Sequence, residues 1–260
     1  MKAGTITSNL ISRLRLMRTA LSRRFIYNDI VQMARAYGIE YRDVVGNIEP
    51  FEFVEAVLNI KDGAHPDFGW LQKQKALFNI TGLPLEAVSE PSVARFIGKL
   101  VFHLDARTVV ELGTFSGWTS AHISLALLSR ENGGRLYCVE MHDRHIDASR
   151  LNLARYELDQ GVEIIRGMSM DKYVLERLPN SIDLVFLDTS HSYPGTRDEM
   201  NLYLPLLSAR GCLVLHDSVA APGVRRSLIE VPKGFRQMSF ATEDGNGVTI
   251  LAQPTLFEVR

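Results

Sequence analysis

The stretch that most constrains the fold of this chain runs from Thr108 to Ser120. A β-branched apolar run ends in Glu111, two glycines four residues apart (Gly113 and Gly117) follow, and a helical pattern then begins. An apolar β-branched run is typical of a buried strand, and the glycines allow a tight turn. The stretch therefore predicts a strand that turns into a helix N-terminus, where backbone N–H groups and a positive dipole end face outward.

The acid in this turn limits what the turn can hold. A dinucleotide-binding turn reads G-x-G-x-x-G, so that bare backbone approaches a pyrophosphate. Here Glu111 occupies the place of the first glycine, and its carboxylate would repel a pyrophosphate. A ligand with an amine and a sulfonium suits Glu111 better, with the ligand's own carboxylate at the helix end. We therefore predict S-adenosylmethionine as the cofactor.

Composition and charge describe an ordinary globular protein. The chain has 260 residues, of which 46% are apolar and 23% charged, enough for one α/β domain and an extra element. Its net charge of −1 argues against broad nucleic-acid binding, and its longest apolar runs are strand-sized, so we expect no membrane span. Cys138 and Cys212 lie in strand-like runs and are expected to be reduced, buried thiols of a cytoplasmic protein rather than a disulfide.

The N-terminal region differs from the rest of the chain. Residues 1–24 contain no acid, and they carry Lys2, Arg13, Arg15, Arg18, Arg23 and Arg24. Apolar residues at helical spacing make this a basic amphipathic helix. An organelle presequence and a membrane-surface helix are alternatives to our preferred interpretation, a helix that packs on the body or on a second subunit of a dimer. We expect residues 1–88 to form a helical cap or oligomerisation region and residues 89–260 to form the cofactor-binding domain.

From Thr108 onward, strand and helix patterns alternate, which predicts a doubly wound α/β fold with a parallel sheet. The predicted strands are 108–112, 135–140, 162–166, 182–188 and 211–216, and the predicted helices are 117–130, 144–158, 170–178, 195–207 and 222–230. Residues 235–240 and 248–252 predict a closing hairpin. Ahead of the sheet, Ser89 is a predicted N-cap and Pro91 fits the first turn of a helix.

Ligands of open α/β sheets bind beyond the carboxyl ends of the strands, so the residues there are candidates. Glu111 can accept a hydrogen bond from the cofactor amine, and Thr119 can donate one to its carboxylate. Gly113 and Gly117 allow close approach of the backbone to the cofactor, and Asp188 is a further candidate cofactor contact. Phe115 or Trp118 can place a ring near the sulfonium, with plain packing as the equal alternative. Glu140 lies 29 residues beyond Glu111 (140 − 111), as one strand–helix–strand unit demands. It is predicted to bind the ribose hydroxyls; the alternative is a solvated acid at a strand end.

These segments resemble the motifs of class I methyltransferases, and most of all the catechol O-methyltransferase branch with its sugar and macrolide relatives. The likeness covers roughly the last two thirds of the chain. It implies a Rossmann-like sheet of strand order 3-2-1-4-5-7-6, in which the closing hairpin contributes one antiparallel strand. It implies that Met141 packs on the adenosine, and that Met168 and Ser169 lie at the adenine, with helix capping as the competing role of Ser169. It also implies cofactor contacts by Glu111, Gly113, Phe115 and Thr119.

Two further strand ends supply the expected reaction chemistry. Asp188 ends a buried run, and His191 stands where the catechol enzymes carry a catalytic lysine; a neutral imidazole accepts a proton near physiological pH, so His191 is the predicted base. The resemblance implies that Asp188 and Asp217 are Mg²⁺ ligands. The third ligand departs from the family, because Ser218 replaces an asparagine and His216 is softer than Mg²⁺ prefers. Metal dependence stays open, since without metal Asp217 would orient His191.

The sequence thus favours an S-adenosylmethionine-dependent O-methyltransferase for a small hydroxylated acceptor such as a sugar, a phenol or a natural-product intermediate. One alternative is a cofactor-binding protein without transferase activity, which the intact His191 and Asp217 disfavour. Another is an NAD-type oxidoreductase, which Glu111 and the closing hairpin disfavour. Methylation of nucleic acid is the weakest option, because no basic stripe follows the N-terminal helix. Acceptor specificity is expected to come from the N-terminal region and from loops such as 218–224 and 241–247.

Overall fold

The structure is a computed structural model that describes residues 48–49, 51–61, 63–80, 88–131, 133–242 and 245–256. The chain divides into two units, Met1–Asn47 and Ile48–Arg260, and the described residues all belong to the second. The basic amphipathic helix expected in residues 1–24 and its role in a dimer lie outside the described residues. Within the described part, no helix is long and apolar enough to cross a bilayer.

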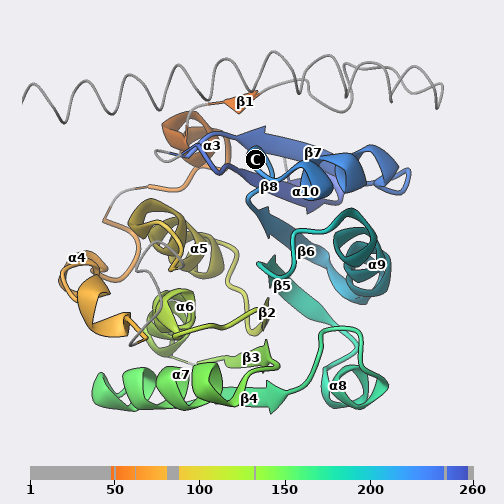
Figure 1. Ribbon diagram of the computed structural model, residues 1–260. Coiled ribbons are helices and arrows are strands. Elements are labelled where there is room, and N and C mark those ends of the chain that lie inside the picture. Colours follow the sequence, from red (N-terminus) through yellow and green to blue (C-terminus); the bar gives the residue numbers. More distant parts are fainter. Residues whose placement is uncertain are drawn as a thin grey trace, which may run out of the picture. The chain divides into compact units, whose positions relative to one another are not determined.

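A single mixed sheet forms the centre of this unit (Figure 1). Its strands are β1 (Ile48–Glu49), β2 (Thr108–Leu112), β3 (Arg135–Glu140), β4 (Val162–Arg166), β5 (Ile182–Leu187), β6 (Leu207–His216), β7 (Arg236–Phe240) and β8 (Val248–Ala252). Their order in space is β1-β7-β8-β6-β5-β2-β3-β4. Strand β8 is antiparallel to β6 and β7, and the other neighbouring pairs are parallel. If β2 is numbered as strand 1, the order read from β4 to β7 is the expected 3-2-1-4-5-7-6. The short edge strand β1 is an addition that the sequence did not indicate.

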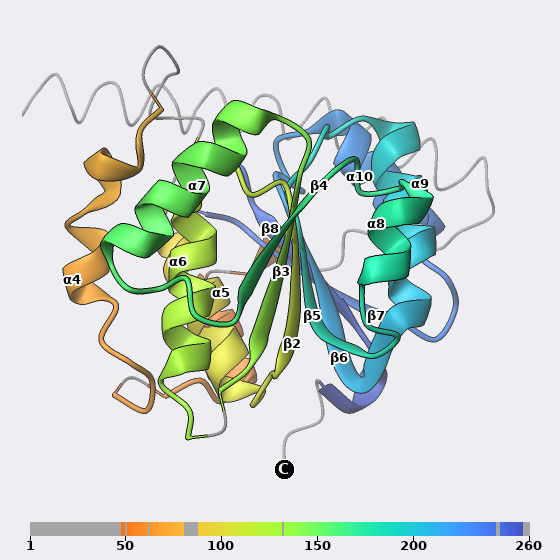
Figure 2. The same ribbon diagram turned by 90° about the horizontal axis from the view of Figure 1, so that it is seen from below.

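Helices cover both faces of the sheet, which Figure 2 shows nearly edge-on. One face is covered by α5 (Pro91–His103), α6 (Trp118–Leu128) and α7 (Asp143–Arg155), with the short α3 (Phe51–Val57) and α4 (Gly69–Gln72) outside or beside them. The other face is covered by α8 (Lys172–Arg177), α9 (Tyr193–Tyr203) and α10 (Pro222–Ser227). Short 3₁₀ turns lie at Lys75–Phe78, Leu204–Leu206, Leu228–Glu230 and Pro254–Leu256. The two helical layers are what a doubly wound sheet requires to bury both of its faces.

The core forms because alternate residues of the central strands point to opposite helical layers. Val109 of β2 packs in the cluster on the α5 and α6 side, whereas Val110 and Leu112 pack in the cluster on the α9 side. All three are fully buried, and each such side chain contributes about 2 kcal/mol of transfer free energy. Cys138 in β3 and Cys212 in β6 are buried free thiols, as expected. Strand β2 is therefore held rigidly between β3 and β5, and its carboxyl end has a fixed position.

The start of α5 corrects one expectation. The N-cap residue is Glu90, which makes no side-chain capping hydrogen bond, and Pro91 opens the helix. The prediction that Ser89 is the N-cap is wrong, because its hydroxyl donates instead to Asp188 Oδ2 at 3.2 Å. A tertiary contact with the end of β5 thus takes the hydroxyl that local sequence would assign to the helix.

Candidate active site

A cavity of about 490 Å³ lies beyond the carboxyl ends of the strands, within the size range of small-molecule sites. Its wall includes most of the residues that the sequence singled out, namely Glu111, Gly113, Phe115, Trp118, Thr119, Glu140, Met141, Met168, Ser169, Asp188 and His191. Gly117 and Asp217 are not part of this wall. Strand β2 lies between β3 and β5, so the cavity opens at the point where the strand order reverses.

Gly113 fixes the turn that forms the floor of this cavity. Its φ is +89°, and a Cβ atom there would lie 1.9 Å from the carbonyl oxygen of Asp188. Its own N–H donates to the Val139 carbonyl at 3.0 Å, and Asp188 N–H donates to the Leu112 carbonyl at 2.9 Å. Only glycine combines this backbone conformation with so close an approach. The turn therefore ties together the ends of β2, β3 and β5.

Gly117 lies where α6 packs against α7. It precedes α6 with φ +80°, and a Cβ atom there would lie 2.7 Å from Ser149 Oγ of α7. Its lack of a side chain allows two helices to approach each other. The close approach of α6 and α7 therefore also depends on a glycine at this position.

Glu111 is a buried acid without a cationic partner in the described part of the chain. It is 1% exposed and accepts hydrogen bonds from Ser120 Oγ and, at 3.4 Å, from Cys138 Sγ. Burial raises the pKa of Glu111 to about 8, although the Ser120 hydrogen bond acts in the opposite direction. A buried carboxyl that lines a cavity in this way favours a ligand that brings a positive charge or hydrogen-bond donors.

Glu140 is held in place by backbone donors at the end of β3. Its Oε1 accepts from Met141 N–H at 2.9 Å and His142 N–H at 3.0 Å, and its Oε2 accepts from Phe115 N–H at 3.0 Å. His145 Nδ1 lies 3.4 Å from Oε1. At 6% exposure Glu140 is not a solvated strand-end acid. Its carboxylate is fixed before any ligand arrives, which is how rigid recognition of paired hydroxyl groups is achieved.

The two aromatic residues of the turn pack differently. Trp118 is 2% exposed, and its ring centroid lies 5.1 Å from that of Phe78 in an edge-to-face arrangement. Packing therefore accounts for most of its surface. Phe115 has a positive φ of 50° and lies 4.7 Å from the His145 ring. Thr119 donates from Oγ1 to Ser89 Oγ at 3.3 Å, which links the helix end to the hydroxyl that contacts Asp188.

Methionine side chains line the cavity after β3 and β4. Met141 and Met168 are each 50% exposed, which is unusual for large apolar side chains and suits the two faces of a flat ring. Ser169 donates to Glu199 Oε1 and does not cap α8, whose N-cap residue is Asp171. The alternative role of Ser169 as a helix cap is therefore wrong.

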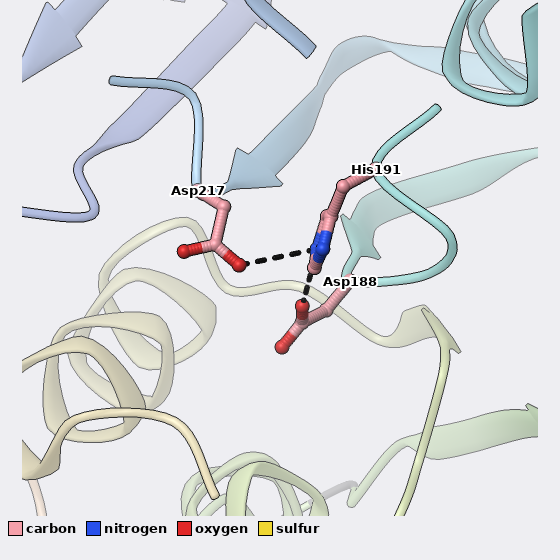
Figure 3. A group of neighbouring side chains, drawn as sticks. All are labelled: Asp188, His191 and Asp217. Atoms are coloured by element: carbon pink, nitrogen blue, oxygen red, sulfur yellow. Dashed lines mark hydrogen bonds and ion pairs between the residues drawn. The ribbon is translucent and has the colours of Figure 1, made fainter. Parts of the chain in front are cut away.

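Asp188, His191 and Asp217 converge where β5 and β6 end side by side (Figure 3). His191 Nε2 lies 3.1 Å from Asp188 Oδ1 and 3.2 Å from Asp217 Oδ2. One ligand atom from each of the three residues lies within 4.8 Å of the other two, so the group can hold a metal ion. His191 and Asp217 have positive φ values of 54° and 53°. Both residues thus have a left-handed backbone conformation, which non-glycine residues rarely adopt and which often occurs at functional sites.

The charges of this cluster are strongly coupled. Burial alone would raise the pKa of Asp188, but His216 and His191 outweigh it and hold that pKa well below its usual range. The hydrogen bond that His191 donates to Asp188 raises the pKa of His191, against the smaller effect of burial. Burial and the neighbouring Asp188 carboxylate raise the pKa of Asp217. The Asp188 carboxylate thus lies beside two histidines whose positive charge stabilises its ionised form.

The structure adds one pair that the sequence did not reveal, Glu90 with His216. His216 Nε2 lies 2.7 Å from Glu90 Oε2, and Glu90 Oε1 accepts from Thr242 Oγ1 at 3.1 Å. The other nitrogen of His216, Nδ1, lies 3.3 Å from Asp188 Oδ1 and 3.5 Å from Asp217 Oδ2. Glu90 gave only a helix-start signal, because nothing local says which distant side chain it will meet.

Comparisons with known proteins agree with this arrangement. Residues 110–218 match the sequence model of a family described as "Methyltransferase domain". A catechol O-methyltransferase of Niastella koreensis is 28% identical over 144 residues, covering 55% of this chain and 62% of its own length. One from Mycobacterium tuberculosis is 30% identical over 144 residues, covering 54% of this chain and 60% of its own. The chain thus spans about three fifths of the length of these curated relatives.

Solved structures share the fold. An SAH-bound methyltransferase of Podospora anserina aligns with a TM-score of 0.62 at 18% identity, covering 80% of this chain and 99% of its own. An O-methyltransferase of Bacillus cereus in complex with SAH (S-adenosylhomocysteine) aligns with a TM-score of 0.58 at 21% identity, covering 78% and 96%. Residues 110–218, from within β2 to just beyond β6, thus resemble a methyltransferase domain, and this chain shares its fold with solved methyltransferases that hold SAH.

Proposed function

We propose that this protein is an S-adenosylmethionine-dependent O-methyltransferase that acts on a hydroxyl group of a small molecule such as a phenol, a sugar or a natural-product intermediate. One observation carries the proposal: a single cavity is lined both by the buried acids Glu111 and Glu140 and by the cluster residues Asp188 and His191. The first pair suits an amino-acid nucleoside, and the second pair suits a hydroxyl group that must lose its proton. The catechol O-methyltransferase relatives support an acceptor of this type.

The cavity residues have chemistry that fits the cofactor. Bound S-adenosylmethionine would supply an electrophilic methyl group on a sulfonium. Glu111 would accept hydrogen bonds from the ammonium of the ligand, and Thr119 would donate to its carboxylate. Glu140 would accept from the ribose hydroxyls, and Met141 and Met168 would pack on the adenine. The buried carboxyl of Glu111 and the half-exposed methionines are the features that support this orientation.

His191 is the proposed base. Both carboxylates of the cluster contact its Nε2, so in the neutral ring the proton lies on Nε2 and Nδ1 is the acceptor. Nδ1 would take the proton of the acceptor hydroxyl, and the carboxylates would stabilise the imidazolium that results. The acceptor oxygen would then form its bond to the methyl carbon as the carbon–sulfur bond breaks. Holding oxygen, carbon and sulfur in line is expected to supply most of the rate gain.

Asp188 and Asp217 are also placed to hold a divalent cation. Such an ion would supply positive charge that favours the ionised form of the acceptor hydroxyl. Oxygen ligands on adjacent strand ends suit Mg²⁺, the ion that the family resemblance implies. Assistance by a divalent ion is part of this proposal, as are a dimeric state, a cytoplasmic location and a role of residues 1–88 in shaping the acceptor pocket. Val88, which lines the cavity, supports the last of these.

The experiment that tests this function combines binding with transfer. Calorimetry should show binding of S-adenosylhomocysteine at one site per chain and no comparable binding of NAD. Transfer of a labelled methyl group to a panel of catechols, phenols and sugars should then be lowered at least ~100-fold by His191→Ala, the usual size of a general-base contribution. The affinity for S-adenosylhomocysteine should change less than about twofold.

A matched control is available in His103→Ala, because His103 is exposed at the end of α5 and away from the cavity. This variant should keep the wild-type rate. A rate unchanged by His191→Ala would exclude His191 as the base. Binding of NAD in place of S-adenosylhomocysteine would refute the proposed function itself.

A further inference from the structure

The paired side chains Glu90 and His216 suggest which metal this site takes. His216 is the last residue of β6, and Glu90 precedes α5, so the pair links a strand end to the start of a helix. Both residues are about 95% buried, with 5% of His216 and 4% of Glu90 exposed. A metal-binding imidazole almost always donates its other N–H to a partner such as a carboxylate, which fixes the tautomer and the ring orientation.

The contacts of His216 show where a metal ion would lie. Its Nε2 donates to Glu90 at 2.7 Å, so in the neutral ring Nδ1 carries a lone pair. Nδ1 is buried, makes no hydrogen bond within the described structure, and lies 3.3 Å and 3.5 Å from oxygens of Asp188 and Asp217. Either a proton on Nδ1 or a metal ion among the three atoms balances the two carboxylates, and a metal ion that binds here takes the place of that proton. Two oxygens and one nitrogen therefore converge on one position.

The remaining candidates for a third ligand face elsewhere or have another role. Ser218 Oγ accepts from Thr249 Oγ1 at 2.8 Å and is buried beside β8, so it does not replace the asparagine of the catechol enzymes. His191 contacts the same carboxylates from the cavity, has a side chain 32% exposed, and has no second carboxylate fixing its other nitrogen among the described contacts. His216 is thus the nitrogen that is pre-oriented for a metal.

The donor set does not fit magnesium well. Mg²⁺ prefers an all-oxygen octahedron, whereas imidazole suits Zn²⁺, Fe²⁺, Co²⁺ and Ni²⁺. We propose that Asp188, Asp217 and His216 form a divalent metal site with one nitrogen ligand, held by Glu90, which binds first-row transition ions such as Co²⁺ and Zn²⁺ in preference to Mg²⁺. The proposal concerns the same site as the proposed function, but it is tested by metal binding in the absence of any acceptor. Its failure and the failure of methyl transfer are therefore distinguishable.

The test measures metal affinity on the full-length chain after chelator treatment and removal of the chelator. Calorimetry with Co²⁺, Zn²⁺ and Mg²⁺ should give one site per chain and at least ~100-fold tighter binding of Co²⁺ and Zn²⁺ than of Mg²⁺, in the direction of the general affinity order. His216→Asn offers an amide oxygen instead of the nitrogen. It should reduce the Co²⁺ to Mg²⁺ affinity ratio at least tenfold, largely by weakening Co²⁺ binding.

Three further variants separate the possible ligands. Glu90→Gln should weaken Co²⁺ binding by about 10- to 100-fold, the usual effect of removing a carboxylate behind a metal-bound histidine. His191→Ala should leave the affinity ratio within about threefold of wild type. His103→Asn, on the exposed end of α5, controls for adventitious binding by surface histidines and should change nothing.

Several outcomes would overturn the proposal. The first is equal affinity for Mg²⁺ and Co²⁺, and the second is the binding of no divalent ion at one site per chain. The third is a Co²⁺ to Mg²⁺ affinity ratio that His216→Asn leaves unchanged. The fourth is loss of the preference for Co²⁺ in His191→Ala. If the buried substitutions unfold the chain, pulsed electron paramagnetic resonance of Mn²⁺ on the wild-type protein decides alone. A ¹⁴N coupling from a directly bound imidazole that persists in His191→Ala supports the assignment, and an all-oxygen signal refutes it.

Discussion

Replacement of Glu111 by glutamine should stabilise the ligand-free protein at alkaline pH and weaken its binding of the cofactor. Burial raises the pKa of Glu111 to about 8 from an ordinary value of 4.5, so between these values the folded chain holds a proton that the unfolded chain releases. Stability therefore falls as the pH rises through this window, and the loss is complete above about pH 8. The two pKa values differ by about 3.5, and each pH unit corresponds to about 1.4 kcal/mol, so ionisation of Glu111 costs the native state about 5 kcal/mol.

Urea unfolding between pH 6 and pH 9 measures this effect directly. Relative to the wild type, Glu111→Gln should gain up to about 1.4 kcal/mol per pH unit until about pH 8 and then stay constant. Glu157→Gln, an exposed acid after α7, is the matched control and should follow the wild-type curve. Parallel stability curves for the wild type and Glu111→Gln would show that Glu111 carries no extra proton in the native state.

The same titration should govern cofactor binding. An ammonium beside Glu111 requires the ionised carboxylate, so binding of S-adenosylhomocysteine below pH 8 should release up to about one proton. Wild-type affinity should then rise by as much as about tenfold per pH unit from pH 6 to 8, whereas Glu111→Gln should be ~10- to 100-fold weaker at pH 8 and independent of pH. Calorimetry in buffers of different ionisation enthalpy counts the proton. An absence of proton release would refute the assignment of Glu111 to the amine.

Three other perturbations test the fold and the site. Gly113→Ala should lower stability by about 3 kcal/mol or more and abolish cofactor binding, because the new Cβ meets the Asp188 carbonyl at 1.9 Å; wild-type thermal stability would contradict the described turn. Leu112→Ala removes a fully buried side chain between β2 and the α9 layer and should cost about 2–5 kcal/mol in urea unfolding, while an exposed-site control such as Leu151→Ala should cost less than about 1 kcal/mol. Chelator treatment should lower methyl transfer and the melting temperature together, and Co²⁺ should restore both; indifference of both measurements to the chelator would argue for a metal-free reaction.

The central sheet was predictable from the sequence because its strands are buried on both faces. Such strands read as nearly continuous apolar runs, and β2, β3 and β4 begin and end at the expected residues. Strand β6 begins at Leu207, before the expected 211, because its first part is more exposed and lacks that apolar signal. The turn after β2 was equally predictable from local sequence, because an acid near the strand end is followed directly by two glycines. Local sequence therefore determined the fold class and the position of the cavity.

Side-chain partners were decided by tertiary structure. Ser89 and Ser169 both stand where helix caps are expected, yet their hydroxyls donate to Asp188 and Glu199, which belong to distant segments. Glu90 and His216 are 126 residues apart, and neither position shows by itself that it has the other as its partner. A strand or a turn follows from the residues within it, whereas a buried polar group bonds to whichever distant group the packed fold brings within about 3 Å. The sequence alone thus determined the fold and the cavity, and folding decided which buried acid orients which histidine.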